Sequence, residues 1–183
     1  MSESVPEGWE VCNFGRYAKI KNGFAFNSSY LNEKENGYFP VIRMSNLKQG
    51  VLDLSDAVYV DTSVVSDLDQ YKLKPNDFIF GMSGSIKNYG VVKINDGVCY
   101  QNQRVGKLQS LGSNQTYLSY LFISDLISRK IELMAAGAAQ LNISAAQIEE
   151  IEVLFPPLPE QKKIASILTS VDEVIEKTQS QID

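Results

Sequence analysis

The stretch from Phe155 to Asp183 constrains the fold of this 183-residue chain more than any other part of it. Three prolines stand near its start, and neither Pro nor Gly follows Pro159. Proline cannot continue a strand, but it suits the first turn of a helix, where its missing N–H would be unpaired anyway. Glu160 then supplies an acid where the helix dipole favours one. The sequence therefore predicts a long helix within 156–183.

Apolar residues along this helix recur at steps of four and three, with Thr178 in the remaining position, which is the spacing of a coiled-coil seam. Ile167 and Val174 widen the apolar stripe. Two interpretations stay open: an amphipathic helix lying on its own domain, or a seam that pairs with another helix. The seam is favoured because the chain reaches Asp183 without a Gly or Asn cap, as if cut in mid-helix. The predicted pairing residues are Ile164, Leu168, Val171, Ile175 and Ile182.

The run PPLPEQKKIASIL followed by this amphipathic helix closely resembles the start of the conserved spacer region of type I restriction–modification specificity (S) subunits. The resemblance extends over almost the entire chain. It implies a target recognition domain over 1–155 and a conserved spacer helix over 156–183, for coiled-coil pairing, dimerisation or methyltransferase docking. Recognition domains of this kind are α/β (α+β), with a twisted, mostly antiparallel sheet and flanking helices.

Turn signals and apolar runs predict the elements within 1–155. Asn95-Asp96-Gly97 predicts a β-hairpin between strands at 91–94 and 98–101. Asn114 is a candidate N-cap, and Ser144 with Gln147 fits a capping box. Further strands are expected at 39–44, 51–59, 78–80, 102–108 and 151–155, and helices at 62–69, at 114–136 and briefly after 144.

Composition excludes several classes of function. The chain has no histidine, which rules out imidazole-based acid–base or triad catalysis. Cys12 and Cys99 are far apart without a CxxC pair, so we expect two small buried hydrophobes and no zinc or other metal site. Walker, glycine-rich cofactor and NPPY-like methyltransferase motifs are absent. The chain is therefore predicted to be non-catalytic and to hold no cofactor.

No apolar run approaches the roughly 18 residues of a membrane span, and Met1 opens a polar, acidic segment unlike a signal peptide. We therefore expect a cytoplasmic protein without membrane contact. The net charge of −5 is unevenly distributed: residues 145–183 hold eight acids and three lysines, whereas residues 70–110 hold six bases and two acids. A basic stretch on an otherwise neutral domain is compatible with DNA contact.

Four polar segments offer side chains that can bond base edges or phosphates. The loop GMSGSIKNYG lacks the phosphate-loop pattern, and the resemblance places such a serine- and glycine-rich loop in the target recognition domain. Asn and Gln can bind adenine bidentately, and Arg can bind guanine. The structural alternatives are a tight strand connection, a strand-end cluster and a helix-end turn. The candidate DNA-binding residues are Arg43, Asn46, Ser83, Ser85, Lys87, Asn88, Tyr89, Asn102, Gln103, Arg104 and Gln140.

The resemblance implies a subunit that recognises one half of a bipartite double-stranded DNA target. Methyltransferase (M) and restriction (R) subunits would carry the chemistry, with S-adenosylmethionine, ATP and Mg²⁺ bound on those partners. A complete S subunit has two recognition domains, and this chain has one. It is either a piece of a longer chain or a half-subunit that forms a homodimer through its C-terminal helix and reads a palindrome.

Two other interpretations remain. The chain matches the recognition portion of a fused DNA methyltransferase or restriction enzyme, although Met1-Ser2-Glu3-Ser4 before Trp9 favours a genuine start. It also fits a helix-mediated assembly module with no DNA role. The bases that a recognition domain reads do not follow from its loop sequence.

Overall fold

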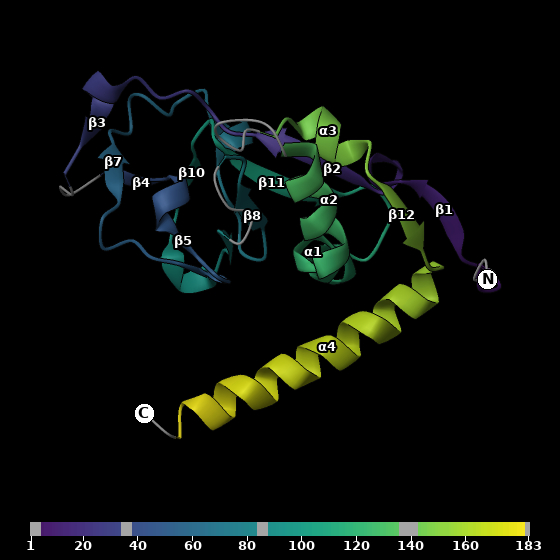
Figure 1. Ribbon diagram of the computed structural model, residues 1–183. Helices are drawn as coiled ribbons and strands as arrows, with labels where there is room; N and C mark the ends of the chain where they lie inside the picture. The colour runs from purple at the N-terminus through teal and green to yellow at the C-terminus, as the bar shows by residue number, and fades with distance from the viewer. Residues whose placement is uncertain (1–4, 34–37, 84–87, 136–142, 182–183) are drawn as a thin grey trace.

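The computed structural model describes residues 5–33, 38–83, 88–135 and 143–181. As predicted, the fold is mixed α/β, with antiparallel sheets and a long C-terminal helix (Figure 1). The expected single sheet is replaced, among the described residues, by two four-stranded sheets and two two-stranded pairs. Figure 1 shows helices α1, α2 and α3 gathered on one side of the molecule. The sheet that contains β3, β4, β7 and β10 lies on the other side, and α4 runs below both.

The first four-stranded sheet has the order β2-β11-β8-β9 and is antiparallel throughout. Successive side chains of a strand point to opposite faces of its sheet. On β8, Phe78 and Phe80 therefore enter one core while Ile79 enters another. The strands are β2 (Ala18–Asn22), β11 (Val105–Ser110), β8 (Phe78–Gly81) and β9 (Tyr89–Val91).

The larger core lies between this sheet and the helices. The ring of Phe122 lies 4.3 Å from that of Phe80 and 5.6 Å from that of Phe78, centroid to centroid. Gly106 makes this packing possible, because a Cβ there would come within 2.6 Å of the Phe80 ring. The helices that cover the sheet are α1 (Gln115–Ile123), α2 (Asp125–Ala135) and α3 (Ala145–Glu149).

The second four-stranded sheet has the order β10-β4-β7-β3, and its β10–β4 pair is parallel. Two antiparallel pairs complete the described strands: β5 with β6, and β1 with β12, which brings the N-terminal strand beside the start of the long helix. These strands are β10 (Tyr100–Gln101), β4 (Phe39–Ile42), β7 (Val58–Val60), β3 (Leu31–Asn32), β5 (Leu47–Lys48), β6 (Val51–Leu52), β1 (Glu10–Asn13) and β12 (Glu152–Phe155).

The predicted hairpin at 91–101 is wrong. Residues Ile94–Asp96 form a 3-10 turn in which Asp96 Oδ2 accepts a hydrogen bond from the Lys93 amide at 2.6 Å. The flanking strands then separate, since β9 pairs with β8 while β10 pairs with β4 in the other sheet. Gly97 does adopt the left-handed φ of 71° that its turn position suggested.

Other local predictions meet mixed outcomes. The predicted helix at 114–136 breaks at Ser124, whose ψ of 154° is extended, and the predicted helix at 62–69 is a series of turns. The predicted strand at 51–59 divides into β6 and β7, and the one at 102–108 begins at Val105 after a turn. Both caps are confirmed, because Asn114 Oδ1 accepts from the Tyr117 amide and Ser144 forms its capping box with Gln147.

Helix α4 (Leu158–Gln179) begins after Pro157, as the prolines predict, and its first turns are fastened to the domain. Glu160 accepts a hydrogen bond from the Trp9 indole at 2.9 Å. The buried Gln161 accepts from the Asn114 amide and donates to the Pro156 carbonyl, each at 2.9 Å. Among the described helices, none combines the length and apolar character that a membrane crossing requires.

We expect Gln161→Leu to weaken the attachment of α4 strongly. The substitution keeps the side-chain volume close but leaves the half-buried Asn114 N–H and the buried Pro156 C=O unpaired, at about 1–3 kcal/mol for each group that water does not reach. Urea unfolding followed by Trp9 fluorescence measures the loss. Gln109→Leu, at an exposed position of β11, is the matched control and is expected to change the unfolding free energy little. Equal stability of the two variants would contradict the assigned role of Gln161.

Candidate nucleic-acid interface

The end of strand β8 joins the segments that the sequence singles out. The Met82 amide donates to the Arg104 carbonyl at 3.0 Å, and the Met82 carbonyl accepts from the Ile143 amide at 3.1 Å. The Ser83 hydroxyl lies 3.1 Å from the Met44 sulfur. Three chain segments far apart in sequence therefore meet at residues 82–83.

A shallow hollow of about 320 Å³ lies at this junction. Ser83 is buried within its wall, whereas the side chains of Gln103 and Arg104 are exposed. An exposed amide beside an exposed guanidinium can donate and accept hydrogen bonds toward base edges or phosphates. The lining residues are Asn22, Met82, Ser83, Gln103, Arg104, Ile143, Ser144 and Gln147.

The turn that carries Gln103 and Arg104 is held from both sides. The Asn102 amide donates to the Ile42 carbonyl at 3.2 Å, and the Asn102 carbonyl accepts from the Val105 amide at 2.9 Å. Gly23 permits a close approach, since a Cβ there would lie 2.2 Å from the Asn102 carbonyl oxygen. Asn102 thus shapes the turn, and the next two side chains project from it.

The candidate DNA-binding set lacks three polar residues of the hollow, Asn22, Ser144 and Gln147. Asn22 ends β2, and a polar residue at a strand end has no distinctive sequence signal. Gln147 was assigned only to its capping box, where its Oε1 accepts from Ser144. Gln147 also lines the hollow, where its side-chain amide nitrogen has no partner among the described residues.

Arg43 and Asn46 are committed to the fold. Asn46 is 1% exposed, with Oδ1 accepting from the Arg43 amide and Nδ2 donating to the Asp53 carbonyl. Arg43 donates through Nη2 to the Asp56 carbonyl at 2.9 Å, and its buried Nε has no partner among the described residues. Asn46 therefore presents no polar surface to DNA.

The predicted loop at 83–89 divides between two places. Tyr89 stacks on Phe78, with ring centroids 5.6 Å apart, and lines a separate cavity beside α4. Burial, and then the nearby charge of Asp172, raises the pKa of the Tyr89 hydroxyl. Asn88 is half-buried, and its carbonyl accepts from the Gly81 amide at 2.8 Å. The predicted residues Ser85, Lys87, Gln140 and Ile182 lie outside the described residues.

The described bases of the 70–110 stretch do not gather around the hollow. Lys107 forms an ion pair with Asp77 at 3.3 Å, with its side chain 16% exposed. Lys93 lines the cavity beside α4. Arg104 is the basic residue among those that line the hollow.

The cysteines form no site. Cys99 is buried in the second core, as expected, and burial, reinforced by the charges of Asp96 and Asp77, raises the pKa of its thiol to about 12. Cys12 is half-buried. Within the described ranges, no three metal-ligating side chains come together.

Helix α4 presents an exposed apolar face. Ile167, Val171 and Val174 are 55%, 50% and 63% exposed, and with Ile175 they line a shallow groove along the helix. The predicted seam residue Ile164 instead packs on the larger core of the domain. The exposed stripe on Ile167, Val171 and Val174 overlaps the rest of the predicted seam, whose residues Leu168, Val171 and Ile175 are 37%, 50% and 55% exposed.

The described residues thus form an α/β domain with a polar hollow at a strand junction and a helix with an exposed apolar face. Residues 6–183 match the model of the type I restriction modification DNA specificity domain, and the chain belongs to this family. Family membership confirms the predicted resemblance.

Individual relatives agree with this assignment. The chain is 28% identical over 178 residues to the type I restriction enzyme EcoAI specificity subunit of Escherichia coli, covering 94% of this chain and 29% of that protein. It is 26% identical over 188 residues to the EcoKI specificity subunit of Escherichia coli K12, covering 98% and 39%. The chain thus spans well under half the length of these relatives.

A solved structure agrees with the fold. The HsdS subunit from Thermoanaerobacter tengcongensis superposes with a TM-score of 0.66 at 17% identity, covering 98% of this chain and 41% of that one. At this identity the likeness shows the fold alone, and it confirms the predicted fold class.

Exposure separates structural from surface candidates. We expect Asn46→Ala to destabilise the chain by about 1–3 kcal/mol, since it removes both hydrogen bonds of a buried side chain and leaves the half-buried Arg43 amide and Asp53 carbonyl without them. Gln103→Ala is expected to stay within about 0.5 kcal/mol of the original chain, because its side chain is exposed. Thermal unfolding followed by circular dichroism compares the stability of the two variants. A larger loss of stability for Gln103→Ala than for Asn46→Ala would contradict the assignment of Asn46 to the fold and of Gln103 to the surface.

Proposed function

We propose that this chain is a DNA sequence-specificity module of a type I restriction–modification system and reads one half of a bipartite target. The family match over residues 6–183 carries this proposal. The hollow beside residues 82–83 supports it, because exposed amide and guanidinium groups are suited to base edges.

The two structural parts divide the work. Residues 1–155 form the target recognition domain, and residues 156–183 form the spacer helix. This division is supported by the end of β12 at Phe155 and by the start of α4 at Leu158, just after the proline hinge. The hydrogen bonds of Gln161 across the junction give the recognition domain a defined position on the helix.

Base recognition rests on the turn at 102–104. Arg104 is placed to bind guanine through O6 and N7 or to contact a phosphate, and Gln103 to bind adenine. Asn22 and Gln147 add amide groups to the same hollow. A module with net charge −5 binds DNA weakly by itself and with marked salt dependence, so its partners supply further phosphate contacts.

The module is proposed to be non-catalytic and to act in the cytoplasm, where the host DNA lies. M subunits would dock on it and transfer methyl groups from S-adenosylmethionine. R subunits would use ATP and Mg²⁺ for translocation and cleavage. The absence of Walker, cofactor-loop and methyltransferase motifs from the sequence supports this division of labour.

A second copy of the chain is the proposed partner of α4. A two-fold dimer through the apolar stripe would place two identical recognition domains on one DNA and select a palindromic, gapped target. The exposure of Ile167, Val171 and Val174 supports this pairing. The alternatives are the recognition portion of a fused methyltransferase or restriction enzyme and an assembly module without a DNA role.

Co-expression with the candidate M subunit, followed by mapping of methylated bases in host DNA, tests the function. We expect methylated adenine in a palindromic, gapped motif. Arg104→Ala should lower methylation of that motif about 10- to 100-fold, because a lost base contact costs about 1–3 kcal/mol.

Arg129→Ala is the matched control, because it removes an exposed arginine on α2 that lies outside the hollow. A stable complex without methylation would indicate that a second recognition domain is missing. The absence of any complex would favour the alternatives. Unchanged methylation by the Arg104→Ala variant would remove this residue from the site.

Val171→Asp should convert a helix-paired dimer into a monomer, since it places an unpaired charge in an apolar interface. Gel filtration with light scattering measures the mass. Val171→Leu keeps the residue apolar and should keep the dimer. An unchanged mass for Val171→Asp would contradict pairing through this stripe.

A further inference from the structure

Beyond its first two turns, helix α4 has little contact with the domain. Gln161 and Ala165 are buried, but after Ala165 every described residue of the helix except Thr169 is exposed. The face toward the domain follows positions 161, 165, 169 and 172, which is the spacing of a helix stripe. The orientation of the last turns therefore depends on contacts near residues 169–172.

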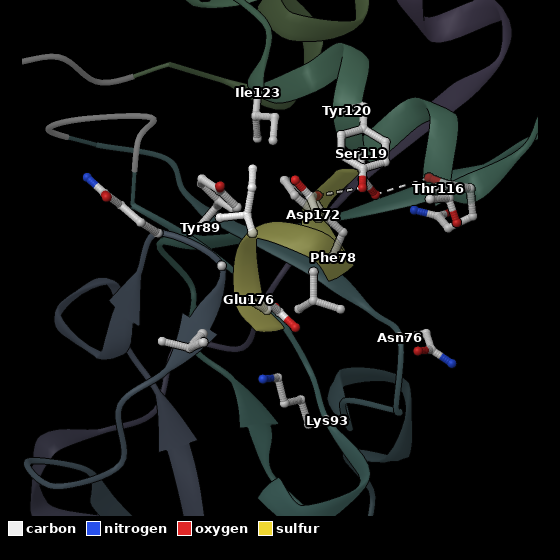
Figure 2. Close-up of a pocket in the computed structure, with 16 residues that line it drawn as sticks. Asn76, Phe78, Tyr89, Lys93, Thr116, Ser119, Tyr120, Ile123, Asp172 and Glu176 are labelled. Atoms are coloured by element: carbon white, nitrogen blue, oxygen red, sulfur yellow. Dashed lines mark hydrogen bonds between the residues drawn. The ribbon is translucent and has the colours of Figure 1, made fainter. Parts of the chain in front are cut away.

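The side-chain hydrogen bonds to residues 169–172 come from one tyrosine on α1. The Tyr120 hydroxyl donates to Asp172 Oδ2 at 2.6 Å and lies 3.4 Å from the Thr169 hydroxyl. Figure 2 shows the Tyr120 hydroxyl directed toward Asp172 across the space between the two helices. Among the described residues, these are the side-chain hydrogen bonds that join the domain to α4 beyond Gln161.

A cavity takes the place of packed side chains next to this contact. It measures about 510 Å³ and lies between strands β8 and β9, helix α1 and the Asp172–Glu176 turn of α4 (Figure 2). Its apolar lining includes Phe78, Val91 and Ile175. Since unfilled space cannot resist movement, packing does not hold this part of the helix in place.

The geometry points to Tyr120 and Asp172 as positioning residues that set the angle between the recognition domain and the spacer helix. The helix extends about 21 Å from Ala165 to Gln179, so a rotation of about 10° at its base moves its end by about 4 Å. That displacement is close to the rise of one base pair, about 3.4 Å. Resting on the proposed function, we infer that this contact determines which gap length between half-sites is accepted.

The orientation is measurable without DNA. Spin labels at Gln109→Cys on β11 and Lys177→Cys on α4 report the distance between the domain and the helix, measured by pulsed electron–electron double resonance. Cys12→Ser removes the half-buried thiol, and the buried Cys99 can stay because it is unreactive. Dilution with an excess of unlabelled chain removes distances between copies.

Tyr120→Phe and Asp172→Ala should each broaden the distance distribution, and the double variant should broaden it no further. Asp172→Asn keeps an acceptor for the tyrosine hydroxyl and should restore the original distribution. Glu173→Ala removes the same charge at an adjacent exposed position and is the control. An unchanged distribution for Tyr120→Phe, or equal broadening by Glu173→Ala, would overturn the inference.

The consequence for recognition is tested with DNA targets of graded gap length, methylated by the complex with the M subunit. Tyr120→Phe should accept a wider range of gaps, while the bases selected in each half-site stay the same. An unchanged gap preference despite a broadened distance distribution would overturn the link to spacing. If the complex methylates nothing, the proposed function fails, and the spin-label result still decides the positioning role.

Discussion

The structure depends on strand β8, whose two faces are both buried. Phe78 and Phe80 pack in the larger core under the helices. Ile79 packs on the opposite face in a second core with Ile42 and Val105, so this one strand contributes to two cores. Its neighbour β11 must then carry Gly106 opposite Phe80, since any larger residue would strike the ring. Strand β8 cannot shift without disturbing both cores. The backbone at its C-terminal end is therefore rigid, and side chains near it hold fixed positions.

The candidate interface uses that rigidity. Met82 directly follows β8 and bonds both to the turn at Arg104 and to the segment that begins at Ile143. Gln103 and Arg104 are thus exposed side chains on a firmly held backbone, a combination that suits selective contacts with bases. Among the described bases of residues 70–110, Arg104 lines the hollow, whereas Lys107 is paired with Asp77 and Lys93 lies beside α4. Under the proposed function, recognition rests on few, well-placed groups and on partners that supply phosphate contacts.

Helix α4, unlike the turn that carries Gln103 and Arg104, is held firmly at one end only. Its base is fixed by the buried Gln161, whereas its outer turns meet the domain through Tyr120 beside a cavity. One face of α4 therefore determines how the domain is held, and the other offers an apolar stripe to a partner. The predicted seam is exposed at Leu168, Val171 and Ile175, but heptad spacing alone does not tell which side of a helix its own domain will cover. Ile164 instead faces the domain.

The sequence by itself determined the proline-led helix, the Asn114 and Ser144 caps, and the family, because these depend on neighbouring residues or on a long distinctive run. Only the tertiary structure decided which polar residues are exposed. The sequence offers both Asn46 and Arg104 as DNA-binding candidates, yet burial commits Asn46 to the Arg43 and Asp53 backbone. The predicted hairpin at 91–101 failed for the same physical reason. Its turn signal is local, but the partner of each strand is set by which core its side chains can fill.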